Sequence, residues 1–158
     1  MEAPEAAASA AGEPIAIAPE APTPVPDEES APFWAGLAEG RIVLQVCPAC
    51  GRRRFPRMPA CPHCGAVGGD DVDASGTGTV YSFVRPQRAL TAASAALAPY
   101  AIATVDLDGG GRMFGRLVPA DACQIGLRVV PAFVDHPGER SVLEGGSAWT
   151  ELCFRPAP

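Results

Sequence analysis

Four cysteines in two short CxxC pairs are the residues of this sequence best suited to chemistry. Cys47 and Cys50 form the first pair, Cys61 and Cys64 form the second, and ten residues separate the two pairs. Two residues between paired cysteines let both sulfurs face one ion, and two such pairs supply the ligands of a tetrahedral zinc site. Each pair is followed by a glycine, which tolerates the positive φ of a tight turn. The spacing therefore predicts zinc bound by all four cysteines.

A zinc ion with four cysteine ligands is expected to be structural. Catalytic zinc usually keeps one coordination position open for water or substrate, and four thiolates leave none. A redox dithiol in either pair is the alternative, but two equivalent pairs are more typical of metal binding. His63 lies between the ligands of the second pair and is not needed as a ligand. The cysteines thus predict a metal that shapes a surface and does not contact a substrate.

The remaining candidates for chemistry do not combine into a catalytic set. His136 lies in the segment VDHPGE, which we interpret as an exposed surface turn. Cys123 and Cys153 are expected to be small buried barrel residues, because unpaired cysteine often fills apolar cores. Asp106 and Asp108 lie near a turn, and turn formation explains them. A stand-alone enzyme is therefore the least favoured of three hypotheses about function.

The first 31 residues differ in composition from the rest of the chain. They contain seven acidic residues and no basic one, and they are rich in alanine and proline. Such a segment has too little bulky apolar surface to offset its ordering entropy, so residues 1–31 are predicted to form a disordered tail. The sequence shows neither a secretory signal nor an apolar run long enough to span a membrane. With six cysteines and no export signal, we expect a cytoplasmic protein without a membrane partner.

The charge of the remaining chain argues against bulk nucleic-acid binding. The net charge is −6 overall, from 12 basic and 18 acidic residues, but residues 32–158 alone come to +1. Binding to nucleic acid without sequence preference depends on an excess of positive charge. Zinc ribbons and OB barrels can nevertheless bind single strands through aromatic and arginine side chains. A single-strand-binding module is therefore the alternative hypothesis, with these candidate residues: Tyr81, Phe83, Arg112, Phe114 and Arg116.

A short helix is expected at residues 32–40, directly before the ribbon. Pro32 suits the first turn of a helix, and Gly40 is well placed to end it. Phe33 and Trp34 lie on this helix. Large aromatic side chains either pack on the rest of the chain or form a partner surface. The sequence leaves both roles open.

The segments beside the cysteines are typical of a zinc ribbon. Residues 41–46 (RIVLQV) are predicted to form a strand that leads into the first cysteine pair. Residues 52–55 could return beside that strand before the second pair. The zinc ribbon is therefore expected at residues 41–70.

Beyond the ribbon, short alternating segments predict a barrel. The five expected strands are residues 78–84, 100–107, 112–118, 127–134 and 149–154. A helical turn is expected after the third strand, and the Ala-rich connection at 85–99 could hold another. Five strands with this insert are typical of an OB-type barrel, here residues 71–158. The predicted fold class is mainly β: a short N-terminal helix, a four-cysteine zinc ribbon and a five-stranded OB-type barrel.

The order of these motifs resembles a known family. The motifs are a P-F-W helix, EGRIVLQ, CPACG, FPR, CPHCG, GTGTVYSF, APYAIATVDLD, GRLV, QIGLRV and a closing FRP. Together they are similar to the rubredoxin-like zinc ribbon/OB-fold family of acyl-CoA-associated proteins, long described as a domain of unknown function. The resemblance covers about residues 32–156. The long acidic tail and the Ala-rich loop at 89–98 depart from the family pattern.

The resemblance implies a non-catalytic accessory subunit. Family members are partners of thiolases, ketosynthase-like condensing enzymes, lipid-transfer-type aldolases or acyl-CoA hydratases, and can help to form the coenzyme A passage. It also implies that the four cysteines are structural zinc ligands and that the loop between the pairs lies near the partner surface. The candidate partner-binding residues are Phe33, Trp34, Phe55, Pro56 and Arg57.

Four arginines of the ribbon, Arg52, Arg53, Arg54 and Arg57, form the densest cluster of positive charge in the sequence. They could bind the phosphates of coenzyme A, pair with an acidic partner or simply solvate the ribbon, because arginine matches phosphate and carboxylate geometry. The sequence leaves these alternatives open. It also leaves open the acyl substrate, the type of partner, condensation or cleavage, and the stoichiometry.

Overall fold

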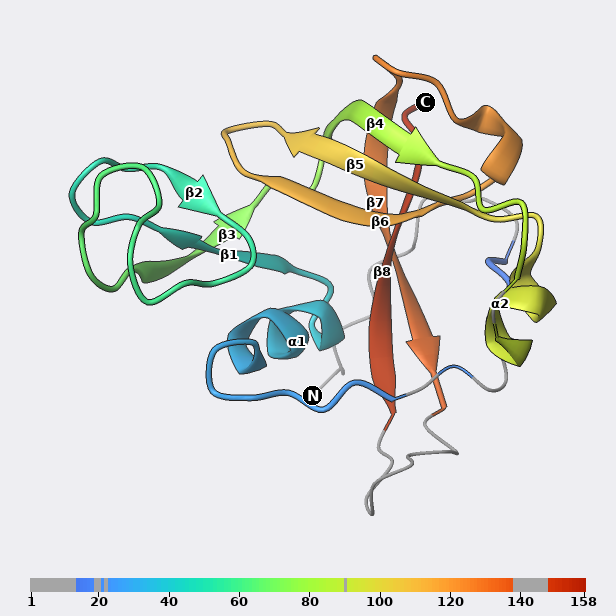
Figure 1. Cartoon of the computed structure of the whole chain (residues 1–158), viewed down its shortest axis with the longest axis horizontal. Coiled ribbons are helices and arrows are strands. Elements are labelled where there is room, and N and C mark those ends of the chain that lie inside the picture. Colours follow the sequence, from blue (N-terminus) through green and yellow to red (C-terminus); the bar gives the residue numbers. More distant parts are fainter. Residues whose placement is uncertain (1–13, 19–20, 22, 90, 138–147) are drawn as a thin grey trace, which may run out of the picture.

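The computed structural model describes residues 14–18, 21, 23–89, 91–137 and 148–158, and these form a mainly β fold. The turns with the four paired cysteines adjoin a three-stranded sheet, and a closed five-stranded barrel follows (Figure 1). The predicted fold class is confirmed. In chain order the elements are α1 (Ala31–Ala38), β1 (Ile42–Val46), β2 (Arg53–Arg54), β3 (Asp70–Ala74), β4 (Gly78–Val84), α2 (Ala92–Leu97), β5 (Ala101–Leu107), β6 (Arg112–Leu117), the 3₁₀ turn η1 (Ala120–Ala122), β7 (Arg128–His136) and β8 (Trp149–Pro156).

Helix α1 packs closely on β1 of the ribbon sheet. It has a proline in its first turn, and Gly40 follows it with a φ of 70°. Gly36 allows the close approach, since a Cβ there would lie 2.5 Å from Cγ2 of Val43. Leu37 is buried in the common core. The helix expected at 32–40 therefore forms, but it begins at Ala31, which the sequence placed in the tail.

The ribbon sheet has the order β2–β1–β3. Strand β1 pairs antiparallel with β2 through Gln45 and Arg54, and with β3 from Ile42 opposite Ala74 to Val46 opposite Asp70. The sequence did not predict β3, because its exposed aspartates give it the composition of a loop. Residues 71–74 thus complete the ribbon sheet, although the sequence placed them in the barrel.

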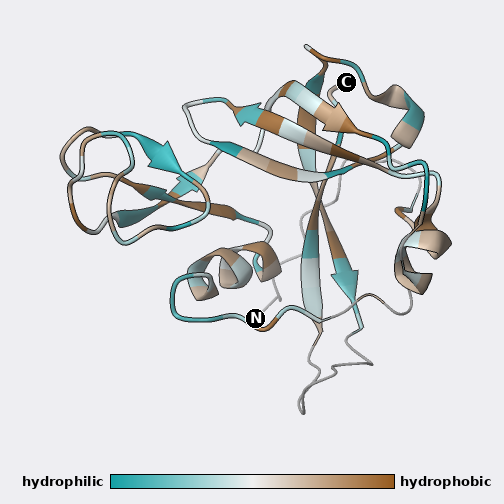
Figure 2. Cartoon of the chain, in the orientation of Figure 1, coloured by the Kyte–Doolittle hydropathy of each residue, from teal (hydrophilic) through white to brown (hydrophobic). Residues whose placement is uncertain are grey.

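The barrel closes in the strand order β4–β5–β6–β8–β7, with β7 pairing back to β4. Strands β6 and β8 are parallel, and the other neighbouring pairs are antiparallel. This is the order of an OB barrel, and η1 lies at the expected position after its third strand. Hydrophobic and hydrophilic residues appear as bands along the strands in Figure 2, and alternation is clearest in β5, where Ala101, Ala103, Val105 and Leu107 are buried. The largest side chains of this core are Phe154, Met113 and Leu117.

The described part of the N-terminal segment contacts the rest of the chain. Ala18 is 3% exposed, although the segment carries no helix or strand before α1. Asp27 and Ser30 exchange hydrogen bonds at the start of α1. Residues 1–13, 19–20 and 22 of the predicted disordered tail lie outside the described residues. Among the described helices, none is both long and apolar enough to cross a membrane.

Candidate functional site

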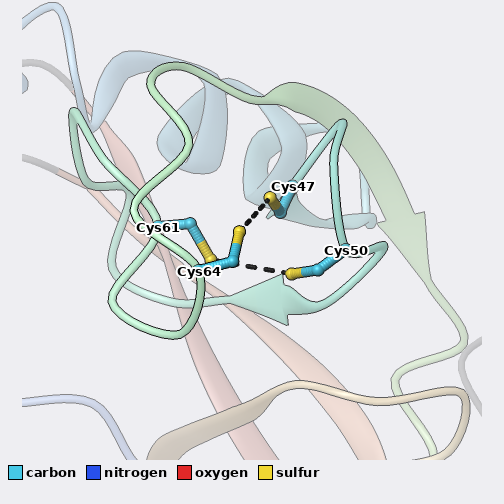
Figure 3. A group of neighbouring side chains, drawn as sticks. All are labelled: Cys47, Cys50, Cys61 and Cys64. Carbon is cyan, nitrogen blue, oxygen red and sulfur yellow. Dashed lines mark hydrogen bonds between the residues drawn. The ribbon is translucent and has the colours of Figure 1, made fainter.

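The four predicted zinc ligands converge on one point. Their sulfur atoms all lie within 4.8 Å of one another. Sγ of Cys47 lies 3.6 Å from Sγ of Cys64, and Sγ of Cys50 lies 3.8 Å from Sγ of Cys61 (Figure 3). Zinc–sulfur bonds of about 2.3 Å in a tetrahedron require sulfur separations of about 3.8 Å, whereas a disulfide needs about 2.05 Å. The four side chains therefore fit a zinc ion and form no disulfide.

Two turns of the same geometry position these sulfurs. In the first turn the amide of Gly51 donates to the carbonyl of Cys47, and in the second the amide of Gly65 donates to the carbonyl of Cys61. Both glycines have positive φ, 70° and 77°, which their lack of a Cβ permits. The repeated local sequence C-P-x-C-G thus produces two equivalent turns that face each other.

Backbone amides in these turns favour the thiolate form that metal binding requires. The amide of Cys50 is the main cause that lowers the pKa of Cys47 to about 6, and the amide of His63 is the main cause of the lowered pKa of Cys61. At Cys64 the amide of Ala66 lowers the pKa, but the neighbouring thiols outweigh it and raise the pKa to about 11. Four sulfurs this close repel one another as anions, and a bound cation relieves that repulsion.

The site offers ligands from cysteine only. Cys47 and Cys61 are buried, whereas Cys50 and Cys64 lie nearer the surface. His63 is exposed and does not belong to the converging group. With four thiolates bound, a zinc ion here has no position for a substrate.

Three of the five candidate partner-binding residues form an aromatic cluster. The ring centroid of Phe33 lies 5.2 Å from Trp34 and 4.7 Å from Phe55. All three side chains pack against the core. Pro56 is exposed, and Arg57 is half-buried in an ion pair with Asp71. The structure thus brings α1 and the loop between the cysteine pairs together at one place.

The four ribbon arginines do not form a single positive patch. Arg54 is buried and donates to the carbonyls of Gly68, at 2.6 Å, and Met58, at 3.3 Å. Arg57 pairs with Asp71 of β3. Both arginines therefore make contacts within the ribbon. Only Arg52 is fully at the surface.

A large cavity adjoins the aromatic cluster, and no motif in the sequence indicated it. Its volume is about 490 Å³, and it lies between α1, α2 and the outer face of β5, β6 and β8. Its aromatic lining comes from both modules: Phe33, Trp34, Phe55, Tyr100, Phe114 and Trp149. The face formed by the second and third barrel strands is where OB folds commonly bind ligands.

A buried ionic network forms one wall of this cavity. Arg116 donates two hydrogen bonds to Glu151, at 2.9 and 2.8 Å, and Nε2 of His136 lies 3.0 Å from the same carboxylate. Burial raises the pKa of Glu151, but Arg116 and His136 outweigh burial and lower it. The imidazole stacks on Trp149 at 4.0 Å.

The interpretation of His136 as an exposed turn residue was wrong. The side chain is 5% exposed, because β7 continues through position 136 and pairs it with Trp149 of β8. Extending the strand predicted at residues 127–134 by two residues would have placed His136 in it.

The other isolated candidates have structural roles. Cys123 and Cys153 are buried, as predicted, and burial raises both pKa values, that of Cys153 to about 12. Asp106 pairs with Arg112. Asp108 pairs with Arg128 and accepts from Thr77, contacts that lower its pKa to about 2. These two aspartates are therefore not a catalytic carboxylate pair.

The surface suggested for single-stranded nucleic acid has little free positive charge. Arg116 is neutralised by Glu151 and Arg112 by Asp106. Part of the usual OB ligand face is occupied by the aromatic residues of α1 and the ribbon loop. The nucleic-acid hypothesis is therefore not favoured.

Comparison with known proteins identifies the family. Two family models match: the ChsH2 rubredoxin-like zinc ribbon domain over residues 34–67 and the ChsH2 C-terminal OB-fold domain over residues 71–134. The DUF35 domain-containing scaffold protein of Methanocaldococcus jannaschii is 30% identical over 124 residues, which cover 72% of this chain and 84% of that protein. The chain belongs to the ChsH2/DUF35 family. The ribbon match in this ChsH2/DUF35 chain includes all four cysteines.

Solved structures agree with this assignment. A chain of the Ltp2-ChsH2(DUF35) aldolase is 33% identical, with a TM-score of 0.62, over 85% of this chain and 99% of that one. A DUF35-family protein of unknown function from Sulfolobus solfataricus is 16% identical with a TM-score of 0.54, which supports the fold alone.

Two longer relatives are named as hydratase subunits. The probable enoyl-CoA hydratase alpha subunit of Thermomonospora curvata is 35% identical over 86% of this chain. The 3-oxo-4,17-pregnadiene-20-carboxyl-CoA hydratase alpha subunit of Mycobacterium tuberculosis is 34% identical over 72%. The chain spans only 40% and 36% of these two relatives, respectively.

Proposed function

We propose that this ChsH2/DUF35 chain is a non-catalytic accessory subunit that binds a thiolase-, ketosynthase- or lipid-transfer-aldolase-like enzyme acting on acyl-CoA substrates. The observation that carries the proposal is its likeness to a chain of the Ltp2-ChsH2(DUF35) aldolase across both modules. The scaffold protein of Methanocaldococcus jannaschii supports the same role. Among the described residues, the cysteines and aspartates considered above and His136 are committed to metal, core or ion pairs, whereas His63 is exposed and lies outside the sulfur cluster.

In this proposal, zinc held by Cys47, Cys50, Cys61 and Cys64 fixes the loop that the partner contacts. Gln45 supports the loop from β1 by accepting the amide hydrogen of Met58 at 3.0 Å. Apolar side chains are exposed at this end of the ribbon: Met58 at 39% and Val67 at 82%. Exposed apolar residues beside a rigid turn suit a protein interface. Phe33, Trp34 and Phe55 would support this surface from behind, with Pro56 and Arg57 at its edge.

Coenzyme A at the partner interface is the second part of the proposal. Arg52 is exposed, and it has no ion-pair partner within the described ranges. It is therefore the ribbon arginine most available for a phosphate. Arg54 and Arg57 are assigned to holding the loop instead.

A cytoplasmic location belongs to the same proposal. All six cysteines are free, and thiols close enough to bind zinc persist in a reducing compartment.

The test is capture of a partner from the native host with the zinc-loaded full chain as bait. We expect a thiolase-like acyl-CoA enzyme, identified by mass spectrometry, and acyl-CoA turnover by the pair. We expect none by this chain alone. Turnover by the isolated chain would overturn the non-catalytic role.

A matched pair of surface variants locates the interface. Val67→Asp should weaken partner binding at least tenfold, since it places a charge in a buried apolar contact. Ile125→Asp changes an equally apolar side chain, 66% exposed, on the barrel and should leave binding unchanged. If both variants bind the partner with equal affinity, the end of the ribbon around Val67 is not part of the interface.

A further inference from the structure

We propose that a second cavity, next to the zinc ribbon, is a binding site for a small apolar carboxylate, such as an aromatic acid. This ribbon cavity lies between the segment before α1, helix α1, strand β1 and the loop that follows β2. The inference goes beyond the proposed function, because it gives the chain a small-molecule site that needs no partner to be tested.

The buried guanidinium of Arg54 is the feature of this cavity that calls for an anion. Arg54 lines the cavity and is 8% exposed. Its Nη2 donates to the neutral carbonyls of Gly68 and Met58, whereas its Nε and Nη1 have no hydrogen-bond partner. Among the described residues, no carboxylate lies within ion-pair distance of Arg54. A buried charge with unused N–H groups and no counter-ion is costly, and a bound carboxylate offsets that cost.

The carboxylates in the cavity wall do not supply the missing counter-ion. Asp27 accepts hydrogen bonds from the amide and the hydroxyl of Ser30, at 2.8 and 2.6 Å. Glu29 lies 3.8 Å from Nε of Arg57, and 57% of its side chain is exposed. Both acidic residues are exposed, so they mark the open side of the cavity. The charge of Arg54 is therefore left for a ligand.

The rest of the lining is apolar, and this selects an organic anion. The apolar walls come from α1, β1 and the ribbon loop: Phe33, Trp34, Val43, Phe55 and Pro56. The volume of about 270 Å³ equals that of about nine water molecules at about 30 Å³ each. A bare inorganic anion would leave these walls in contact with water, whereas the body of an organic acid covers them. A ligand of the size of benzoate fits both the volume and the lining.

Calorimetric titration of the zinc-loaded full chain tests the ligand class. At constant ionic strength, benzoate should bind saturably. Benzamide has the same shape without the charge, and inorganic phosphate has the charge without the apolar body. Both should bind at least tenfold more weakly than benzoate. In proton–nitrogen NMR spectra, the Nε–H signal of Arg54 should shift as benzoate saturates the chain, which locates the site.

Two substitutions on strand β2 supply a variant and its matched control. Arg54→Lys keeps the positive charge but removes the unpartnered Nε and Nη1, so benzoate binding should weaken at least tenfold. Arg53 is the neighbouring residue of β2 and does not line the cavity, so Arg53→Lys should change binding less than twofold. Zinc content and circular dichroism check that both variants fold.

A second pair of variants does not depend on the buried arginine. Glu29 lines the cavity, and its carboxylate repels a bound anion, so Glu29→Gln should tighten benzoate binding at least threefold. Glu28 is exposed and does not line the cavity, so Glu28→Gln makes the same change in net charge with less than a twofold effect. A gain of affinity cannot come from misfolding, so this pair decides the matter if Arg54→Lys does not fold.

Any of three results would overturn the site. These are no saturable binding of benzoate, binding of benzamide or phosphate as tight as that of benzoate, or equal effects of Glu29→Gln and Glu28→Gln. Normal partner capture by a chain that does not bind benzoate rejects this inference and leaves the proposed accessory role intact. Benzoate binding by a chain that captures no partner supports this inference and counts against the accessory role.

Discussion

The ribbon and the barrel of this chain are stabilised by different interactions. The barrel closes on itself and buries large apolar side chains, among them Phe154 and Met113. At the cysteine end of the ribbon, β2 has two residues, and the buried side chains there are Cys47, Cys61, Arg54 and Gln45. So small a polar interior cannot offset the entropy of ordering two turns. The barrel can therefore fold through apolar burial, whereas the cysteine end of the ribbon, residues 47–67, needs its metal.

The ribbon and the barrel share part of one apolar core, so the ribbon does not depend on metal along its whole length. Ile42 and Leu44 of β1 and Leu37 of α1 belong to the same core as the barrel. The barrel end of the ribbon sheet is therefore held by apolar contacts. Metal dependence is expected to be confined to the cysteine turns and the loop between them, residues 47–67.

The largest effect should follow loss of the metal. Cys61→Ser removes a buried ligand, and structural zinc sites contribute apparent binding energies of about 10–16 kcal/mol to folding. We expect zinc content to fall from one ion per chain toward zero. Amide resonances of residues 47–67 should collapse while those of the barrel persist, and partner binding should be lost through this instability.

The control for that experiment is Cys123→Ser. Cys123 is buried but lies outside the sulfur cluster, so one zinc ion should remain. A zinc-free Cys61→Ser protein that keeps its ribbon resonances and still binds its partner would falsify the metal dependence.

A smaller loss of stability, located in the barrel and not in the ribbon, is expected for a change in the apolar core. Phe154 is completely buried, and Phe154→Ala should lower the free energy of unfolding by about 3–5 kcal/mol through the cavity it leaves. Chemical denaturation followed by circular dichroism measures this change. Zinc content should stay at one ion per folded chain.

Ile125→Ala serves as the surface control for the barrel. The side chain is largely exposed, so its removal should change the free energy of unfolding by less than about 0.5 kcal/mol. If Phe154→Ala costs no more than this control, the barrel does not depend on burial as described.

The smallest of the three effects concerns the ionic network in the wall of the cavity. Glu151→Gln should lower the free energy of unfolding by about 2 kcal/mol, which is the scale of a hydrogen bond to a charged group. A larger loss is not expected, because 21% of the Glu151 side chain is exposed to solvent. The pKa of Glu151 is lowered in the folded chain, so its ionised form stabilises the protein above the unfolded pKa of about 4.3. That contribution disappears as the pH falls through the lower folded pKa.

Unfolding measured from pH 5 to pH 3 tests this sign. The difference between the parent chain and Glu151→Gln should shrink as the pH falls below about 4. Acid release of zinc affects both proteins alike and cancels in the difference. A difference that grows toward low pH would mean that the carboxylate does not stabilise the folded state.

The zinc site and the barrel strands were predictable because their signals are local. Two residues between cysteines and a glycine after each pair specify a turn that closes within one segment. Alternation predicted the buried faces of β5 and β6 in the same way. The strand β3 was not predicted, because three of its five residues are aspartates, which are typical of loops. Its half-buried residues, Val72 and Ala74, are too few to give a clear strand pattern.

The spacing of the cysteines and the pattern of the strands were enough to predict that four sulfurs meet and that five strands form a barrel. The contacts between these two modules could be seen only in the folded chain. Arg116 and Glu151 are 35 positions apart, and His136 joins them because β7 and β8 pair in one particular register. The cavity depends on the packing of α1 and α2 against the barrel. Such contacts depend on register and packing, which no short segment encodes alone.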